Sequence, residues 1–486
     1  MLNRRAKDGK PIPDAIYRSL YQYFNGKKTE AELTAEEKAY ISQVIVKDVH
    51  HEIIKDRRYT KQFFYQFHVP IVFNANAPKR PKINERVLEY IKENPDVNII
   101  GIDRGERHLV YLTLINQRGE ILKQKTFNVV GDYNYQEKLK QRENERDQAR
   151  KSWQSVGKIK DLKEGFLSAV VHEIVKMMID YNAIVVLEDL NWGFKRGRFK
   201  VERQVYQKFE KMLIDKLNYL SFKDVDTVNE GGILRGYQLT EPVANYTDIG
   251  KQTGFLFYIP AAYTSKIDPA TGFVNHFNFN DITNAEKRKD FFMKMERIEM
   301  KNGNVEFEFD YRKFKTYQTD FQNVWTINTS GKRIVFDTEK REHKAVYPTH
   351  EIVQAFGNKG ITLEEGTDIK ALIEGIEADV KNASFFSSLF YAFKTTLQMR
   401  NSNADTREDY ILSPVVRDGR QFCTTDEVEK GKDADGNWIS RLPVDADANG
   451  AYHIALKGLY LLLNPQTKKI ENEKWLRFMV EKPYME

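Results

Sequence analysis

Two short apolar runs in this chain end on a carboxylate. Residues 97–102 read Val-Asn-Ile-Ile-Gly-Ile and precede Asp103, and residues 183–187 read Ala-Ile-Val-Val-Leu and precede Glu188. Short apolar runs rich in β-branched side chains are typical of buried strands. Sites in open α/β sheets form beyond the carboxyl ends of the strands. We therefore expect both carboxylates at one edge of a sheet.

The elements around these runs predict the fold class. Residues 109–115 and 120–130 favour two more strands around a turn at 116–119, which gives an antiparallel meander. Apolar side chains at every fourth position over 162–178 predict an amphipathic helix, and another helix is expected over about 202–220. A strand with a hairpin, followed by helix, strand and helix, predicts an α/β, ribonuclease-H-like fold.

A third carboxylate, Asp447, lies at the start of a capped, alanine-rich helical stretch. Three carboxylates at one point repel one another and do not ionise together without a counter-charge. Mg²⁺ is a hard cation that takes oxygen ligands and completes its shell with water and substrate phosphate. Two such ions about 3.5–4 Å apart activate a water and stabilise the leaving oxygen of a phosphodiester. Asp103, Glu188 and Asp447 are therefore the candidate metal ligands of a hydrolase.

The pattern by itself leaves other interpretations open. A strand-end aspartate is commonly a turn or cap residue. Glu188 and Asp189 could cap a helix that begins at Leu190, and Asp445 and Asp447 could be ordinary N-cap residues.

The rest of the chain differs in texture from place to place. The start is polar and lysine-rich, with helices expected over 14–24 and 35–46 and strands over 60–73. Residues 135–152 are almost wholly charged or polar and predict a solvated helix. Residues 264–443 combine short segments with scattered aromatics, and we expect a separate domain inserted into the first one.

Composition excludes several classes of protein. Cys423 is the one cysteine, which rules out an internal disulfide framework and any zinc site with two thiolates. The net charge is only +6, so a polyanionic partner must meet local patches. No run approaches the roughly 18–20 apolar residues of a membrane span, and the N-terminus lacks the apolar segment of a signal peptide. We expect a soluble intracellular protein.

Longer blocks of the sequence carry a family resemblance. They are Gly101-Ile-Asp-Arg-Gly-Glu-Arg107, Val185-Val-Leu-Glu-Asp-Leu-Asn191, Gly193-Phe-Lys-Arg-Gly-Arg-Phe-Lys200, Leu397-Gln-Met-Arg-Asn-Ser402 and Asp445-Ala-Asp-Ala-Asn-Gly-Ala-Tyr-His453. In this order and spacing they resemble the RuvC and Nuc regions of the type V-A CRISPR effectors, the Cas-twelve-a (Cpf-one) nucleases. The resemblance runs through essentially the whole chain.

The resemblance implies a RuvC domain split into three segments, an inserted α+β Nuc domain and a β-rich wedge fragment in front. Trp153 resembles the aromatic residue that anchors the bridge helix. The implied limits are wedge 1–96, RuvC segments 97–134, 153–263 and 444–486, bridge helix 135–152 and Nuc 264–443.

The same resemblance implies site residues and an activity. Asp103, Glu188 and Asp447 match the metal ligands, with Mg²⁺ or a substituting Mn²⁺ as cofactor. Arg400 matches an arginine important for DNA cleavage, and Asp409 lies nearby in the motif. The family cuts both strands of a target DNA at this one site and, once activated, single-stranded DNA. RNA–DNA pairing reads the target sequence, as in other CRISPR effectors.

The wedge of this family also processes precursor guide RNA without metal. Lys55 matches one basic residue of that site, and Arg4 stands where the family usually has a lysine. A histidine of the site should lie just upstream of Met1, so we expect the processing site to be incomplete here. By pattern alone, Lys55 and Arg4 are equally surface charges.

Other basic and aromatic residues also allow two interpretations. A cluster next to Glu188 could clamp phosphate, with salt-dependent affinity, or form a solvated loop. Arg400 follows an expected helix over 385–399 and could simply favour its C-terminus. Trp153 could be an ordinary core aromatic. The residues of the cluster are Lys195, Arg196, Arg198 and Lys200.

Members of the family are much longer, with a recognition lobe ahead of these regions. We therefore expect a C-terminal fragment or split half in a prokaryotic cytoplasm, whose partners are guide RNA, target DNA in double- and single-stranded form, and the missing N-terminal half, with no membrane. A catalytically silent nucleic-acid binder is the alternative. Transposon-type RuvC nucleases usually carry a cysteine zinc ribbon, which the single cysteine opposes. Ribonucleases and Holliday-junction resolvases share the fold, which does not by itself decide the substrate.

Overall fold

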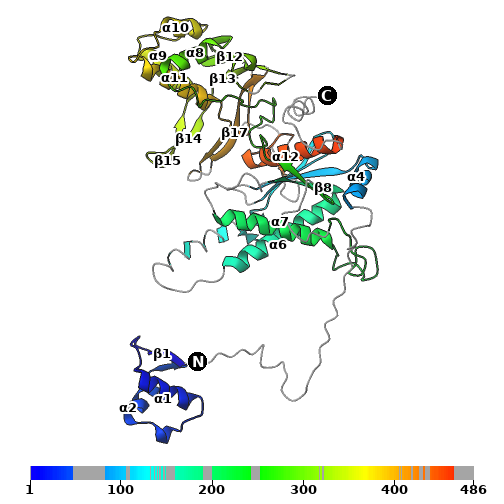
Figure 1. Cartoon of the computed structure of the whole chain (residues 1–486), viewed down its shortest axis with the longest axis vertical. Helices are drawn as coiled ribbons and strands as arrows, with labels where there is room; N and C mark the ends of the chain where they lie inside the picture. The colour runs from blue at the N-terminus through cyan, green and yellow to red at the C-terminus, as the bar shows by residue number, and fades with distance from the viewer. Residues whose placement is uncertain are drawn as a thin grey trace. The chain divides into compact units, whose positions relative to one another are not determined.

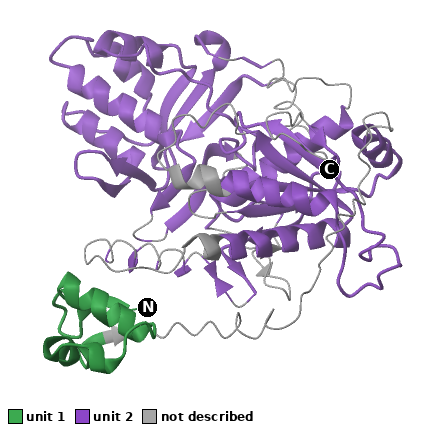
Figure 2. Ribbon diagram, turned by 60° about the horizontal axis from the view of Figure 1, so that its bottom comes forward, with its two compact units in different colours: residues 1–72 green, residues 73–486 purple. Residues whose placement is uncertain are grey.

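The computed structural model divides the chain into two compact units, Met1–Val72 and Phe73–Glu486 (Figure 2). The residues that it describes are 2–46, 83–104, 110–131, 133–135, 137–138, 141, 144–145, 148, 159–189, 200–241, 252–316, 318–319, 322–403, 406, 408–417, 420–425, 431–432, 438–439 and 441–464.

The first unit has its own small apolar core. Strands β1 (Leu2–Ala6) and β2 (Val44–Val46) pair antiparallel, and between them in the sequence come α1 (Asp14–Phe24), the 3-10 turn η1 (Glu30–Glu32) and α2 (Ala35–Ile41). The buried core side chains are Leu2, Ala6, Ile12, Ile16, Leu20, Leu33 and Val44.

The helix predicted over 14–24 is confirmed, whereas the one predicted over 35–46 is too long. Helix α2 begins with a capping box, in which Thr34 accepts from the Glu37 amide, but it ends at Ile41. The β-branched run from Val44 to Val46 instead pairs with β1, because such side chains are restricted in a helix and pack well in a sheet.

The second unit is built on a mixed sheet in the order β19-β20-β5-β4-β3-β8-β10-β9. β3, β4 and β5 form the predicted antiparallel meander, while β8 runs parallel to both β3 and β10. This order confirms the α/β class and is consistent with a ribonuclease-H-like fold. The bounds are β3 Asn98–Asp103, β4 Tyr111–Ile115, β5 Ile121–Thr126, β8 Ala183–Asp189, β9 Gln252–Thr253, β10 Leu256–Pro260, β19 Gly431–Lys432 and β20 Trp438–Ile439.

Helices cover both faces of this sheet. Alternate residues of a strand point to opposite faces. Ile100 and Ile102 of β3 belong to the apolar cluster with α6 (Ile159–Asp180) and α7 (Lys200–Asn218), and Ile99 belongs to the cluster with α4 (Ile83–Glu93) and α12 (Ala446–Leu463). Figure 1 shows α6 and α7 below β8 and α12 above it.

Helix α12 lies unusually close to β3. A Cβ added at Gly101 would lie 2.1 Å from the carbonyl oxygen of Ala451 and 2.8 Å from the Cβ of Ala455. Only a residue without a side chain fits at that point of the strand. The contact brings the first turns of α12 against the end of β3.

Residues between β10 and α12 form a second sheet with helices packed on it. Its strand order is β11-β12-β13-β17-β16, with β18 paired to β17, and the hairpin β14–β15 lies outside it. The bounds are α8 Ala285–Met293, β11 Arg297–Lys301, β12 Asn304–Asp310, η4 Tyr311–Lys313, β13 Val324–Asn328, β14 Arg333–Asp337, β15 Glu342–Val346, α9 Pro348–Gly357, α10 Ile369–Gly375, α11 Ala383–Thr396, β16 Arg400–Asn403, β17 Glu408–Arg417 and β18 Arg420–Cys423.

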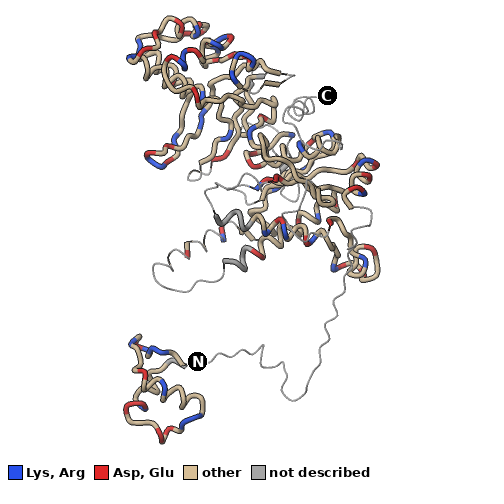
Figure 3. The backbone as a smooth tube through the Cα atoms, viewed as in Figure 1, with Lys and Arg blue, Asp and Glu red and all other residues tan. Residues whose placement is uncertain are grey.

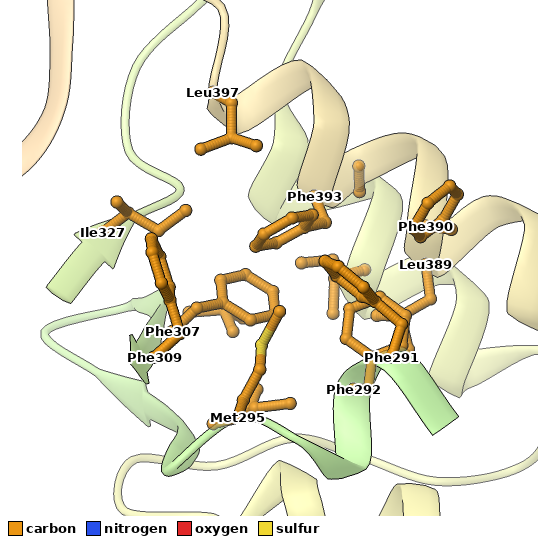
Figure 4. Close-up of a cluster of buried hydrophobic side chains, with 14 of the residues drawn as sticks. Phe291, Phe292, Met295, Phe307, Phe309, Ile327, Leu389, Phe390, Phe393 and Leu397 are labelled. Carbon is orange, nitrogen blue, oxygen red and sulfur yellow. The ribbon is translucent and has the colours of Figure 1, made fainter. Parts of the chain in front are cut away.

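Phenylalanines dominate the core of this segment (Figure 4). The rings of Phe307 and Phe393 meet edge to face at 5.1 Å between centroids, a favoured arrangement of aromatic pairs. Other rings in the same core are Phe291, Phe292, Phe309 and Phe390. This core is separate from the two clusters that flank the first sheet.

Most of the remaining element predictions are confirmed. The apolar positions of α6, such as Phe166 and Ile174, are buried, and the described residues within 135–152 are helical. The third strand of the meander is shorter than predicted: β5 ends at Thr126, and β6 (Val129–Val130) pairs with β7 (Tyr133–Asn134). The strands predicted over 60–73 lie outside the described residues. In the part of the chain that is described, no helix is long and apolar enough to cross a membrane.

Candidate active site

β3 and β8 bring their terminal carboxylates to the same edge of the sheet. These strands are parallel neighbours, and their register pairs Ile102 with Leu187. Asp103 and Glu188 follow at the next position of each strand. Glu188 is therefore the last but one residue of β8, and the residues from 190 to 199, where the alternative helix would begin, lie outside the described residues.

Helix α12 adds the third carboxylate. Asp445 is the N-cap, and its Oδ1 accepts from the Ala448 amide at 2.7 Å. Asp447 lies two residues further on, within the first turn of the helix, and is fully buried, so the cap interpretation holds for Asp445 only. A Cβ at Gly450 would lie 2.3 Å from Oδ2 of Asp103, which puts this turn of α12 directly against the end of β3.

The three carboxylates interact electrostatically. Burial raises the pKa of Asp103 to about 8, with further contributions from the charges of Glu188 and Asp447. A hydrogen bond of 2.8 Å from the Arg104 amide opposes this rise. Burial also raises the pKa of Glu188. Burial is the main cause of both shifts, and at Asp103 the like charges that the sequence predicted add to it.

Arg400 contributes the positive charge of the site. Its Nη2 lies 2.8 Å from Oδ1 of Asp447. Burial by itself lowers the pKa of the guanidinium, but the carboxylates of Asp447, Asp409 and Asp103 outweigh it, and the pKa is raised. Arg400 begins β16, and α11 ends at Thr396, so the interpretation of this arginine as a helix-end charge is wrong.

The donor chemistry of these side chains fits a divalent cation, although they are not gathered around one. Among the described residues, no group of three or more His, Cys, Asp or Glu side chains stands close enough to hold a metal ion. Carboxylate oxygens are nevertheless the ligands that Mg²⁺ prefers. A bound cation would neutralise the negative charge that Glu188 and Asp447 place beside Asp103. Arg400 provides that compensation for Asp447 in this structure.

Three residues that the sequence analysis did not single out complete the surroundings. Arg104 donates from Nη2 to the backbone oxygen of Glu188 at 2.7 Å and lies over the ring of Tyr206 of α7, 5.6 Å from its centroid. Thr264 donates its hydroxyl to Oε1 of Glu188. Lys457 is buried in α12 near Glu188. Arg104 directly follows Asp103 in the segment Gly101–Arg107, but no pattern in the sequence indicated Thr264 or Lys457.

Asp409 links the site to a neighbouring cleft. It pairs across β16–β17 with Ser402, two residues after Arg400. The cleft has a volume of about 770 Å³, and its lining includes Asp409 together with Lys301, Lys332, Glu306 and Glu408. Acidic and basic side chains are mixed there, and both lysines are paired with glutamates.

The remaining predicted residues fall elsewhere. Lys195, Arg196, Arg198, Lys55 and Trp153 lie outside the described residues, and Lys200 begins α7, where its side chain is not described. Arg4 is exposed on β1, with Nη1 3.8 Å from Oδ1 of Asp14, as in its interpretation as a surface charge. Figure 3 shows acidic and basic residues interspersed along the described backbone.

The fold and the site define a class of protein: an α/β protein with acidic residues from two parallel strands and a helix at one sheet edge. The RuvC nuclease domain model matches residues 77–484. The chain belongs to this family of nucleases. RuvC nucleases generally use divalent metal ions such as Mg²⁺.

Proposed function

We propose that this chain is a metal-dependent endodeoxyribonuclease. The observation that carries the proposal is the coupling of Glu188 and Asp447 to Asp103, three carboxylates from β3, β8 and α12. Such a set suits the attack of water on a phosphodiester, a reaction that needs no protein nucleophile.

Each side chain has a role in this proposal. Asp103, Glu188 and Asp447 would hold Mg²⁺, or Mn²⁺ in its place. When bound, the metal supplies positive charge and lowers the pKa of a water. Arg400 presents a planar guanidinium that holds a phosphate by two hydrogen bonds and offsets developing charge. It would exchange its bond to Asp447 for one to the substrate strand.

We further propose that the nuclease is the cleavage part of a type V-A CRISPR effector. The ordered sequence blocks support this proposal. It is also supported by the second sheet with its own core, which lies between β10 and α12 in the sequence although α12 packs on the first sheet. The 264–443 segment is then the Nuc domain, 135–152 the bridge helix and 1–96 the wedge fragment. Guide RNA, target DNA and a recognition half are the proposed partners. Lys195, Arg196, Arg198 and Lys200 are the proposed phosphate contacts.

One observation favours a second function, that of a silent nucleic-acid binder. The described carboxylates are not in ligating positions, and Asp447 is paired with Arg400. In this proposal the site assembles only with the recognition half, and the isolated chain binds nucleic acid without cutting.

Cleavage of labelled single-stranded DNA by the purified chain tests both functions. Mg²⁺, Mn²⁺ and EDTA are compared for the wild type and for Asp103→Ala and Glu188→Gln. Asp189→Asn is the matched control, since Asp189 is exposed beside Glu188 at the same strand end. We expect metal-dependent cutting that both site variants abolish and the control retains.

Cutting that persists in EDTA or in Asp103→Ala would contradict the nuclease site. Binding without cutting by a folded wild-type chain would support the silent function, and the recognition half and a guide RNA would then be added.

A further inference from the structure

Thr264 holds one oxygen of Glu188. Its side-chain hydroxyl is within hydrogen-bond distance of Oε1 of Glu188 and lies 3.1 Å from the backbone oxygen of Ala261. A hydroxyl has a single hydrogen, which these two acceptors share. Thr264 is only 2% exposed, so water does not readily replace these bonds.

Lys457 holds the backbone that carries Thr264. Its Nζ donates to the carbonyl oxygens of Pro260 at 2.6 Å and Ala262 at 3.0 Å, on either side of Ala261. Lys457 is fully buried in α12. An ammonium group in such a place is costly unless it is hydrogen-bonded. These two carbonyls account for a lysine at a position where an apolar residue would otherwise pack.

The contacts form a continuous path between two of the candidate ligands. Asp447 and Lys457 both belong to α12, and Lys457 lies ten residues further along the helix. Lys457 binds the turn that follows β10, and this turn carries Thr264 to Glu188 of β8. A displacement of α12 therefore moves the support of Glu188 together with Asp447.

We propose that Lys457 and Thr264 are positioning residues for Glu188, which fix the orientation of its carboxylate relative to the helix that carries Asp447. The inference rests on the proposed metal-dependent function. A glutamate side chain has several rotatable bonds, and holding one oxygen selects the direction of the other. Hydrogen-bond partners of metal-ligating carboxylates commonly change metal affinity by about 10–100-fold.

The test uses the full chain and Mn²⁺, whose binding is followed by the loss of the free-ion electron paramagnetic resonance signal. Thr264→Val removes the hydroxyl with little change in shape, and Thr264→Ser keeps it. Lys457→Met removes the ammonium at similar length. Circular dichroism and thermal unfolding establish that each variant is folded, and Asp103→Ala gives the level of binding without the site.

We expect Thr264→Val and Lys457→Met each to weaken Mn²⁺ binding about 10-fold, and Thr264→Ser to stay within about 2-fold of the wild type. If Lys457 acts through Thr264, the Mn²⁺ affinity of the double variant should also fall about 10-fold and not about 100-fold, because the effects of coupled substitutions do not add. The cutting rate should follow the same order at limiting metal and recover at high Mn²⁺.

Two results would overturn the inference in different ways. If the wild-type chain binds Mn²⁺ in a way that needs Asp103, and Thr264→Val and Lys457→Met bind it with the same affinity, then the positioning role is wrong and the nuclease site still stands. A folded wild-type chain that binds no Mn²⁺ removes both this role and the proposed metal site. Should Lys457→Met fail to fold, the comparison of Thr264→Val with Thr264→Ser decides the question alone.

Discussion

At the scale of single residues, charge decides the behaviour of this site. Burial, together with the charges of Glu188 and Asp447, raises the pKa of Asp103 to about 8. In the unfolded chain an aspartate titrates near 4. Between these two values the folded state binds the proton more strongly, so the stability that Asp103 contributes when protonated is lost as the pH rises toward 8.

The substitution Asp103→Asn should therefore stabilise the metal-free chain at pH 8. We expect a gain of a few kcal/mol in the free energy of unfolding, since one pKa unit corresponds to about 1.4 kcal/mol and the residue is partly solvated. The gain should vanish at about pH 4, where the wild-type carboxyl is protonated in the fold. Urea unfolding in EDTA at several pH values measures it, and equal stability at pH 8 would contradict the repulsion.

Arg400 gives a second prediction at this scale. Arg400→Ala leaves the buried carboxylate of Asp447 without its guanidinium, which should destabilise the metal-free chain by about 1–3 kcal/mol. The expected loss of stability is smaller than for a fully buried ion pair, because the Arg400 side chain is 41% exposed to solvent. Added Mn²⁺ should raise the thermal midpoint of the variant more than that of the wild type, because a competing cation is gone. Arg400→Lys is the control, and an equal metal response in all three chains would argue against competition.

At the scale of elements, the packing of α12 on β3 and β8 holds the site together. Gly101 and Gly458 allow the approach from the two strands: a Cβ at Gly458 would lie 2.4 Å from Cγ2 of Val186. At Gly101 the backbone of β3 meets the backbone of α12 without an intervening side chain, and at Gly458 the side chain of Val186 from β8 lies against the helix backbone. The distance between β3 and α12 is therefore set by backbone contact, which tolerates little adjustment.

Gly101→Ala should accordingly be strongly destabilising. The new methyl group meets a backbone oxygen, so α12 must move, and we expect a loss of about 3 kcal/mol or more in the free energy of unfolding. Gly375→Ala is the matched control, because nothing lies within 4 Å of a Cβ there. Urea unfolding of both variants measures the difference, and similar stabilities would mean that α12 can relax.

At the scale of the whole molecule, the chain consists of two compact units, each with a core of its own. The helices and strands of the first unit pack on one another through Leu20 and its neighbours. A unit with its own core can fold separately.

A chain that begins at residue 73 should therefore keep the unfolding transition of the second unit, with a thermal midpoint within about 2 °C of that transition in the full chain. Differential scanning calorimetry of the two chains measures this. A large drop in the midpoint, or loss of folding, would show that the first unit stabilises the second.

Local patterns in the sequence were enough to predict the secondary structure around Asp103, Glu188 and Asp447, but they did not predict the strand β16 that begins with Arg400. β-branched runs gave β3 and β8, four-residue spacing gave α6, and the resulting order gave the α/β class. The errors lie where tertiary pairing competes with local preference, as at Val44–Val46, which leave α2 for β1. Domain limits and the roles of the basic residues near 195–200 stay predictions.

The sequence by itself predicted the three candidate ligands, because the strand-end positions of Asp103 and Glu188 and the capped start of the helix with Asp447 are local features. Only the tertiary structure decided their partners. Arg400 meets Asp447 across 47 residues, Thr264 meets Glu188 across 76, and Lys457 meets Pro260 across 197. Hydrogen bonds and electrostatic interactions depend on distance in space. Chain segments so far apart in sequence come together only when the sheet and α12 have packed.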